Sequence, residues 1–308
     1  MTLLITEDSF VEGDETFNLN LFNLSGPATL EEPSRATITI ADDDTTPTST
    51  NPIDDTHTFV CQHYHDFFNR EPDTSGLLFW INNIDSCGAN AACREAKRID
   101  TSAAFFLSIE FQGTGFYAIR LQRTAFGKRS DAASTRMTYQ DLVRDTRQLG
   151  EGVIVGEPGA AVQLEQNKET YATQVVTSAA FIDRFPISQT AAGYVDALYA
   201  SAEITPTATE RTDAITAFGG GGTSGRVAAL RKIAESQSLI NAEFSPAFVL
   251  LQYHGYLRRN PTDLPDTDDS GYQFWLTKLN SFGGDFRKAE MVKAFLSSAE
   301  YRQRFGQP

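Results

Sequence analysis

The sequence lacks any long apolar segment and is poor in basic residues. No stretch of its 308 residues approaches the roughly 18 uninterrupted apolar residues of a membrane-spanning helix, so no span is predicted. It has 26 Lys and Arg against 40 Asp and Glu, which gives a formal net charge of -14. A surface of that sign repels the phosphates of nucleic acids and anionic lipids, so neither is expected as a partner.

Cysteine is also scarce, with three in the chain. Cys87 and Cys93 flank a Gly/Ala/Asn turn in DSCGANAACR, which can bring two Cα atoms within the roughly 4.4–6.8 Å that a disulfide requires. With two close thiols and no nearby histidine, a zinc site is not expected. The pair is either a disulfide, which favours an exported, oxidising setting, or two unrelated free thiols. Cys61 falls on the apolar face of a predicted helix, where we expect it to be buried.

The N-terminal region has β character. LLIT, TFNLNLF and ATITIA alternate or are β-rich, so residues 1–44 predict a small partial β-sandwich whose edges are exposed. Residues 45–56, rich in Thr, Pro, Ser and Asn, predict a linker. The opening segment has neither a basic n-region nor a small-residue cleavage site. We therefore expect the chain to begin inside a longer protein, with any export signal upstream.

From Thr58 onward the pattern is helical and repeats. FVCQHYHDFFNREPDTSGLLFW (59–80) returns as FVLLQYHGYLRRNPTDLPDTDDSGYQFW (248–275), with six extra residues between the proline and the Ser-Gly pair. Each copy closes on a Ser-x-Glu-aromatic segment, SIEF at 108–111 and SAEY at 298–301. Weaker versions start near Phe116 and Tyr194 and close on SAAF and NAEF.

These repeats predict the domain organisation. The expected helical units are 57–115, 116–185, 190–245 and 246–308, of which the middle two are degenerate. Neighbouring units are expected to stack and complete one another's core. The predicted fold class is therefore multidomain and mainly α, with a small partial β-sandwich followed by an α-helical array of repeated units.

Both regions resemble known families. ITEDSFVEGDETFNLNLFNLSGPATLEEPSRATITIADDD resembles the C-terminal half of a Calx-beta domain, through its acidic pair, its EGDE-x-F run and its final Asp-Asp-Asp. FVxxxYxxFxxRxPDxxGxxFW followed by SxEF resembles the bacterial domain of unknown function 4214 family, a helical module often found in exported or surface proteins. Its strong matches cover 57–112 and 246–306. That family has no established chemistry, so its resemblance implies a fold more than a function.

The Calx-beta resemblance implies calcium as a cofactor, bound by acidic residues of two segments. The implied ligands are Glu7, Asp8, Glu12, Glu15, Asp42, Asp43 and Asp44. Calcium prefers carboxylate oxygens, and these carboxylates would repel one another without a cation. The alternative is a solvated acidic edge, since the family's remaining ligands come from a half-domain absent from this sequence.

Three other motifs each have a structural alternative. Asp266, Asp268 and Ser270 take calcium-loop positions, but Thr277 replaces the glutamate of the last one, so helix capping is favoured. FGGGGTSGR departs from a phosphate loop at Arg226, which favours a flexible linker. Of the histidines at 57, 63 and 65, only His65 recurs, as His254, which favours a hydrogen-bonding core residue over a metal ligand.

A recurrent Arg–Asp–Trp set leaves two interpretations open. Arg70, Asp73 and Trp80 recur as Arg259, Asp268 and Trp275. They form either a sugar-binding platform or a structural cluster in which the arginine pairs with a loop acid or caps a helix and the tryptophan is in the core. Repetition of the whole set favours structure.

Together these patterns predict a non-enzymatic, exported bacterial surface or matrix protein. No catalytic residues are predicted, because no nucleophile motif is present. The β domain is expected to bind calcium, and the helical region to contact an unknown protein or glycan at the cell surface. A glycan-binding helical module is the alternative, and a hydrolase using Asp/Glu pairs is a remote one.

Overall fold

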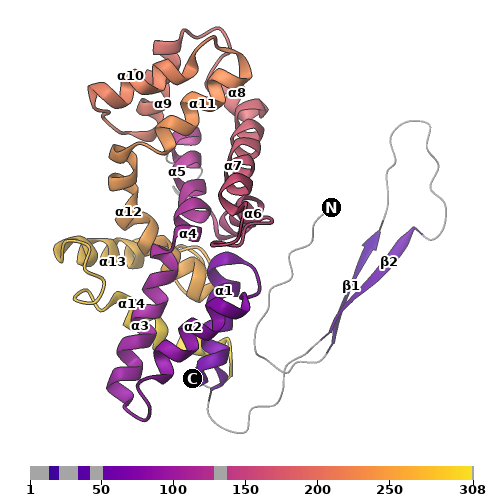
Figure 1. The fold of residues 1–308 in the computed structure, drawn as a ribbon, viewed down its shortest axis with the longest axis vertical. Coiled ribbons are helices and arrows are strands. Elements are labelled where there is room, and N and C mark those ends of the chain that lie inside the picture. The colour runs from indigo at the N-terminus through magenta and orange to yellow at the C-terminus, as the bar shows by residue number, and fades with distance from the viewer. Residues whose placement is uncertain (1–13, 21–33, 42–50, 128–136, 307–308) are drawn as a thin grey trace.

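The computed structural model describes residues 14–20, 34–41, 51–127 and 137–306 (Figure 1). These residues are mainly helical, with one two-stranded sheet near the N-terminus. The predicted fold class is thereby confirmed. Among the described residues, none of the helices combines the length and hydropathy that crossing a bilayer requires.

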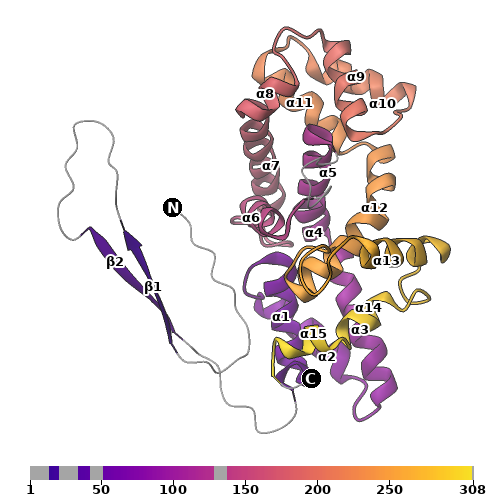
Figure 2. The ribbon, with the colours of Figure 1, turned by 180° about the vertical axis from the view of Figure 1, so that it is seen from behind.

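The sheet is a single antiparallel pair. Strand β1 (Glu15–Asn20) pairs with β2 (Arg35–Ile40), and Phe17 lies opposite Ile38. Apolar side chains on one face are partly buried and the intervening polar ones are exposed, which is the period-2 pattern of a half-covered sheet. In Figures 1 and 2 no described helix lies over either face of the strand pair.

The helical body begins earlier than its composition predicts. Residues assigned to the linker form a 3₁₀ turn, η1 (Pro52–Asp54), in which Ile53 is buried. Asp54 accepts hydrogen bonds from both terminal nitrogens of Arg302, each at 2.8 Å, and Asn51 donates to the Arg302 carbonyl at 2.7 Å. The segment entering the helical body is therefore held by the C-terminal end of that body.

The helices of the first half are α1 (Thr56–Phe68), α2 (Thr74–Asp85), α3 (Ala91–Leu107), α4 (Ile109–Gly113), α5 (Gly115–Phe126), α6 (Tyr139–Gly150) and α7 (Ala160–Thr177). Those of the second half are α8 (Ala179–Arg184), α9 (Ala191–Ala202), α10 (Ala208–Phe218), α11 (Gly222–Ala234), α12 (Gln237–Leu251), the π-helix η2 (Gln252–Tyr256), α13 (Ser270–Ser281), α14 (Met291–Leu296) and α15 (Ala299–Gln303).

In each of the four helical units, a serine caps the N-terminus of a helix near the end of the unit. Ser108, Ser178 and Ser298 each accept a hydrogen bond from the backbone N–H three residues on. In the third run Ser236 has this role, accepting from the Leu239 N–H at 3.4 Å. The predicted NAEF segment lies inside α12 instead. The search for a Ser-x-Glu-aromatic segment therefore placed the end of the third unit too late in the chain. Leu239 occupies the position that an aromatic residue takes in the other three units.

The first and last copies of the repeat pack against each other. Helix α1 contacts η2, and α3 contacts α14, so the first and last units lie side by side (Figures 1 and 2). Phe67 and Tyr256 occupy equivalent positions of the two copies, and their ring centroids are 5.4 Å apart. The array therefore closes on itself, whereas the sequence predicted only that neighbours stack.

The middle of the chain forms the other half of the body (Figure 2). Helix α5 lies at its centre and contacts α6, α9 and α11, while α7 packs on α6 and α11. Helix α12 runs from this half back to the first, so the buried apolar residues form one continuous core. A cavity lies where α5, α12 and α13 approach one another.

Candidate functional site

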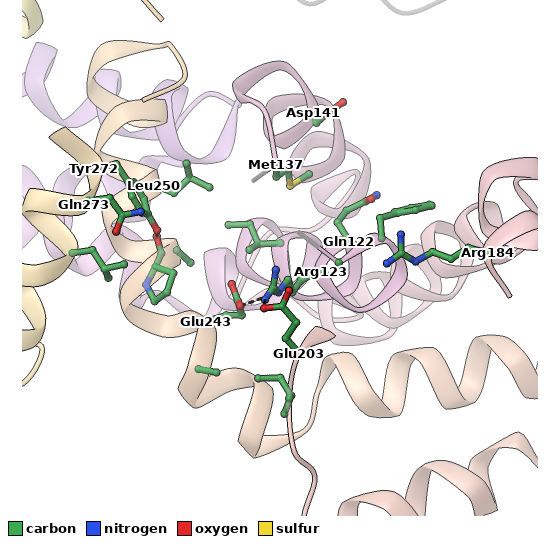
Figure 3. Close-up of a pocket in the computed structure, with 18 of the residues that line it drawn as sticks. Gln122, Arg123, Met137, Asp141, Arg184, Glu203, Glu243, Leu250, Tyr272 and Gln273 are labelled. Carbon is green, nitrogen blue, oxygen red and sulfur yellow. Dashed lines mark hydrogen bonds and ion pairs between the residues drawn. The ribbon is translucent and has the colours of Figure 1, made fainter. Parts of the chain in front are cut away.

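A cavity of about 980 Å³ lies between α5, α6, α12 and α13, and the ends of α8 and α9 also reach it (Figure 3). Ligand pockets are typically about 300–1,000 Å³, so this one is large enough for a small molecule. Its lining comes mainly from the two degenerate units, where no motif indicated a site.

The floor of the cavity is apolar. Ile119 of α5, Ala247 and Leu250 of α12, and Leu276 of α13 line it. The first three are buried and Leu276 is partly buried against the core. An apolar body placed here would be removed from water on this side, which stabilises binding by about 25 cal/mol per Å² of apolar surface.

A charged cluster crosses one wall. Arg123 donates to Glu203 at 3.3 Å, and its Nε lies 3.3 Å from a carboxylate oxygen of Glu243 (Figure 3). The side chains of Arg123 and Glu243 are only 12% and 16% exposed. Both separations exceed the 2.7–2.9 Å usual for charge-assisted hydrogen bonds.

A second polar network supports the opposite wall. Arg144 bridges Asp141 and Asp145 at 2.9 and 2.8 Å. Asp145 is buried and accepts a hydrogen bond from Tyr171 at 2.5 Å. Burial raises the pKa of Asp145, although the Tyr171 and Arg144 hydrogen bonds oppose that shift. Gln122 lines the cavity and donates to Tyr171 at 2.7 Å, so the wall is tied to the core.

Arg184 reaches the same cavity from α8 (Figure 3). It is exposed, and its guanidinium carbon lies 5.9 Å from the ring centroid of Phe185. Together with Arg123 it offers donors above an apolar floor. The arrangement suits an amphipathic ligand, with an apolar body on the floor and acidic or hydrogen-bonding groups at the arginines.

The chain matches no protein-family model and no curated protein. The two family resemblances rest on the residues quoted for them.

One of the predicted calcium ligands is described. Glu15 is exposed at the start of β1, and its Cα partner is Ile40, two residues before Asp42 in sequence. The others, which are Glu7, Asp8, Glu12, Asp42, Asp43 and Asp44, lie outside the described residues. Within the described ranges, no three His, Cys, Asp or Glu side chains are grouped to hold a metal ion.

The predicted cysteine pair is bonded. Cys87 and Cys93 form a disulfide across the turn between α2 and α3, with their Cα atoms 5.6 Å apart. Cys61 is only partly buried, and its sulfur lies 3.7 Å from Nδ1 of His57. Burial raises the pKa of Cys61 to about 11, so it remains a protonated thiol at neutral pH.

The recurrent arginines are engaged inside the fold. Arg70 donates to both carboxylate oxygens of Glu110, at 2.8 and 2.7 Å, and Arg259 donates to those of Glu300 at 2.5 and 3.1 Å. Each pair joins the end of a repeat's first helix to the glutamate of its closing segment. Trp80 is partly buried against the core. These contacts favour the structural interpretation of the arginines.

Two further motifs also have structural roles. Asp266 pairs with Arg259 at 2.8 Å, and Asp268 accepts from the N–H of Ser270, the first residue of α13, at 2.9 Å. The N-cap of α13 is Asp269, whose side chain makes no capping hydrogen bond, so the segment stabilises the start of the helix without the predicted cap. Arg226 is buried and donates to the carbonyls of Phe185 and Pro186 at 2.5 and 3.2 Å. That commitment excludes it from a phosphate loop.

The histidines lie mainly in the core. His63 is fully buried, and Nδ1 lies 2.7 Å from the Phe59 carbonyl, so this nitrogen carries the proton and Nε2 accepts from Ser102. His254 is 2% exposed. His65 instead pairs with the exposed Glu71 at 2.9 Å.

The sequence patterns did not find the cavity residues. Arg123, Glu203 and Glu243 are 80 and 40 residues apart along the chain and belong to no shared motif. The available signal was in α5, where Arg120 and Arg123 interrupt an apolar helix. Arg120 is buried and donates to the Ala234 carbonyl at 2.8 Å, while Arg123 faces the cavity. Composition alone does not distinguish these two outcomes.

Proposed function

We propose that the chain is a non-enzymatic, exported surface or matrix protein whose helical body binds an amphipathic ligand in the α5–α12–α13 cavity. The observation that carries this proposal is the combination of an apolar floor with a charged cluster, Arg123 with Glu203 and Glu243, on one wall. Such a site holds an apolar body and orients its polar end.

The state of the ionisable groups supports binding over catalysis. Arg144 holds both Asp141 and Asp145, and Arg123 holds two glutamates. These four carboxylates therefore already have arginine partners within the protein, which leaves them less available as a general acid or base.

Export is supported by the Cys87–Cys93 disulfide, which lies in a largely exposed turn. Thiols in reducing compartments are kept reduced, so an accessible disulfide favours an oxidising compartment. Alkylation in denaturant of the protein taken directly from its native cells tests this. We expect one alkylated cysteine, Cys61, per chain. Alkylation of all three cysteines would contradict export.

Binding in the cavity is tested with 1-anilinonaphthalene-8-sulfonate, which combines an apolar ring system with an anionic group. Ala242 is an exposed residue of the lining, so Ala242→Trp places a ring in the cavity with little cost to folding. Ala161 is exposed on α7 and is not part of the lining, so Ala161→Trp is the matched control.

The native chain and Ala161→Trp are expected to bind the dye saturably at one site. Ala242→Trp should weaken binding at least tenfold, which corresponds to about 1.4 kcal/mol. Arg184→Gln should weaken it as well, since the sulfonate loses a donor. Absence of saturable binding, or equal binding by both tryptophan variants, rules out this cavity as the site.

We also propose, from the Calx-beta resemblance, that the N-terminal β region binds calcium. The strand register supports this, because Glu15 pairs with Ile40. Ile40 precedes Asp42, the first residue of the Asp42–Asp44 run, by two residues in the sequence. Calorimetric titration of the full chain with calcium chloride should give heat that disappears when Asp42, Asp43 and Asp44 are all changed to Asn. No heat at millimolar calcium, or heat unaffected by these changes, contradicts it.

A further inference from the structure

Most residues that are identical in the two strong copies have a structural role. Phe59 and Tyr64 are buried, as are their counterparts Phe248 and Tyr253. The arginines bind the closing glutamates. The Ser-Gly glycines leave room for the tyrosine hydroxyls, because a Cβ on Gly271 would lie 2.7 Å from the Tyr253 oxygen and one on Gly76 would collide with that of Tyr64.

One identical apolar pair is not explained in this way. Phe79 of α2 and Phe274 of α13 are 62% and 57% exposed. Each lies edge-on to the tryptophan that follows it, with ring centroids 4.8 and 5.0 Å apart. The tryptophans pack on core phenylalanines, Trp80 on Phe105 and Trp275 on Phe295. We call each Phe–Trp pair an aromatic ledge, since a core-anchored ring supports an exposed one.

The surroundings of both ledges indicate the chemistry of a partner. Residues 75–83 and 270–278, one turn to either side of each phenylalanine, contain no carboxylate, although 40 of the 308 residues are acidic. Hydroxyl and amide groups replace them, with Asn82 exposed beside Phe79 and Thr277 beside Phe274. Lys278 is held over the Trp275 ring, with Nζ 5.2 Å from its centroid.

An exposed aromatic ring bordered by uncharged donors and acceptors matches a neutral sugar. The apolar C–H face of a pyranose stacks on the ring, and its hydroxyls bond to amide and hydroxyl groups. Within one turn of its phenylalanine, neither helix offers a cationic partner a carboxylate of its own. We propose that the Phe79–Trp80 and Phe274–Trp275 ledges are two equivalent sites for a neutral oligosaccharide.

This assignment is independent of the cavity, which neither phenylalanine lines. It also differs from a platform built on Arg70 and Arg259, because those guanidinium groups are bound to glutamates. Repetition of the ledge gives the chain two sites on different helices, so a long polysaccharide could be held at both with increased avidity.

The experiment uses the two tryptophans of the chain, Trp80 and Trp275, as reporters. Because each touches its phenylalanine, a sugar stacking on the ledge changes the emission. The probes are cellopentaose and chitopentaose, titrated into the native chain, Phe79→Ala, Phe274→Ala and the double variant. The control is Phe282→Ala, which removes a 43% exposed phenylalanine outside the ledges.

The native chain and Phe282→Ala are expected to bind two sugars per chain, each single ledge variant one, and the double variant none. Thermal unfolding midpoints should stay within about 2 °C, because exposed side chains contribute little to stability. The proposal is overturned if neither sugar, nor any neutral sugar on a glycan array, binds, or if the double variant still binds. It is also overturned if the native chain self-associates through the ledges instead.

Discussion

Asp66 and Arg304, 238 residues apart in sequence, form a buried two-point ion pair with N–O distances of 2.8 and 3.1 Å. Arg258 adds a third contact to Asp66 at 3.1 Å. Burial acts to raise the pKa of Asp66, but the two arginines outweigh it and the pKa is lowered. Arg304 also donates to the Gly255 and Tyr256 carbonyls of the π-helix. The last residues are thereby fixed to the first helix, which closes the array.

We expect Asp66→Asn to be strongly destabilising. Two largely buried arginines would lose the charge of Asp66, whose side chain is 1% exposed, and breaking a buried pair in this way typically costs about 3–5 kcal/mol. Urea unfolding followed by circular dichroism measures the change. The matched control is Asp54→Asn, which breaks a second pair between the two ends of the body, where Asp54 is 46% and Arg302 25% exposed. An exposed pair contributes below about 1 kcal/mol, so equal losses for the two variants would contradict this account.

Acid should destabilise the protein through two buried histidines. Burial lowers the pKa of His63 to about 4 and that of His254 to about 3, against a reference near 6.5. Asp66 opposes the shift at His63, while Arg98 and Arg304 reinforce it. Below pH 6.5 the unfolded chain takes up these protons and the folded chain does not. The stability present above pH 6.5 is therefore lost as pH falls, by about 2 kcal/mol per histidine at pH 5.

The variant His63→Gln isolates one of these contributions. Position 63 corresponds to Gln252 in the last copy, whose amide donates to the Phe248 carbonyl at 3.0 Å as His63 does to Phe59. Glutamine therefore fits this position and does not titrate. Urea unfolding at pH 7 and pH 5 should show about half the native acid sensitivity in the variant. Unchanged sensitivity would mean that His63 is protonated in the folded protein.

The helices could be predicted from the sequence where apolar residues recur at helical spacing over a long segment. The repeat of Phe59, Tyr64 and Phe67 as Phe248, Tyr253 and Tyr256 identified equivalent segments, because burial imposes the same spacing on both. What the period did not indicate is that these equivalent faces meet each other. That pairing depends on Asp66 meeting Arg258 and Arg304, a contact between distant segments.

The cavity was beyond sequence reasoning for a related reason. Arg123, Glu203 and Glu243 come from three helical segments, and a cavity results from how their backbones diverge. The residue type alone did not indicate which arginine lines the cavity. Arg120, one turn before Arg123 on the same helix, instead donates to the backbone carbonyl of Ala234. The disulfide was predictable, because Cys87 and Cys93 are close in the chain and their separation is limited by local geometry.

Reduction of the disulfide should lower stability moderately. Closing a loop of this length removes unfolded-state entropy worth about 2 kcal/mol at 25 °C in the chain-entropy treatment. Cys87→Ser/Cys93→Ser and the native chain in dithiothreitol should therefore unfold at similarly lower urea concentrations. The reductant should have no effect on the double variant. Cys61→Ser is the control, since this thiol takes no part in the bond. Loss of stability in dithiothreitol by the double variant would show that the reductant acts elsewhere.

The close approach of Tyr64 to Gly76 predicts that Gly76→Ala, usually a stabilising kind of change in a helix, lowers the stability of this protein. In an exposed helix, Gly→Ala stabilises by about 1 kcal/mol, but a Cβ at Gly76 would collide with the buried Tyr64 hydroxyl. We expect Gly76→Ala to destabilise by about 1–3 kcal/mol, the usual range for overpacking. In Tyr64→Phe that oxygen is gone and the Asp73 carboxylate oxygens, at 3.0 and 3.3 Å from the added Cβ, are the close atoms that remain, so the same alanine should cost little or be stabilising. A double-mutant cycle in urea measures the coupling, and additive effects would show that the glycine is kept for another reason.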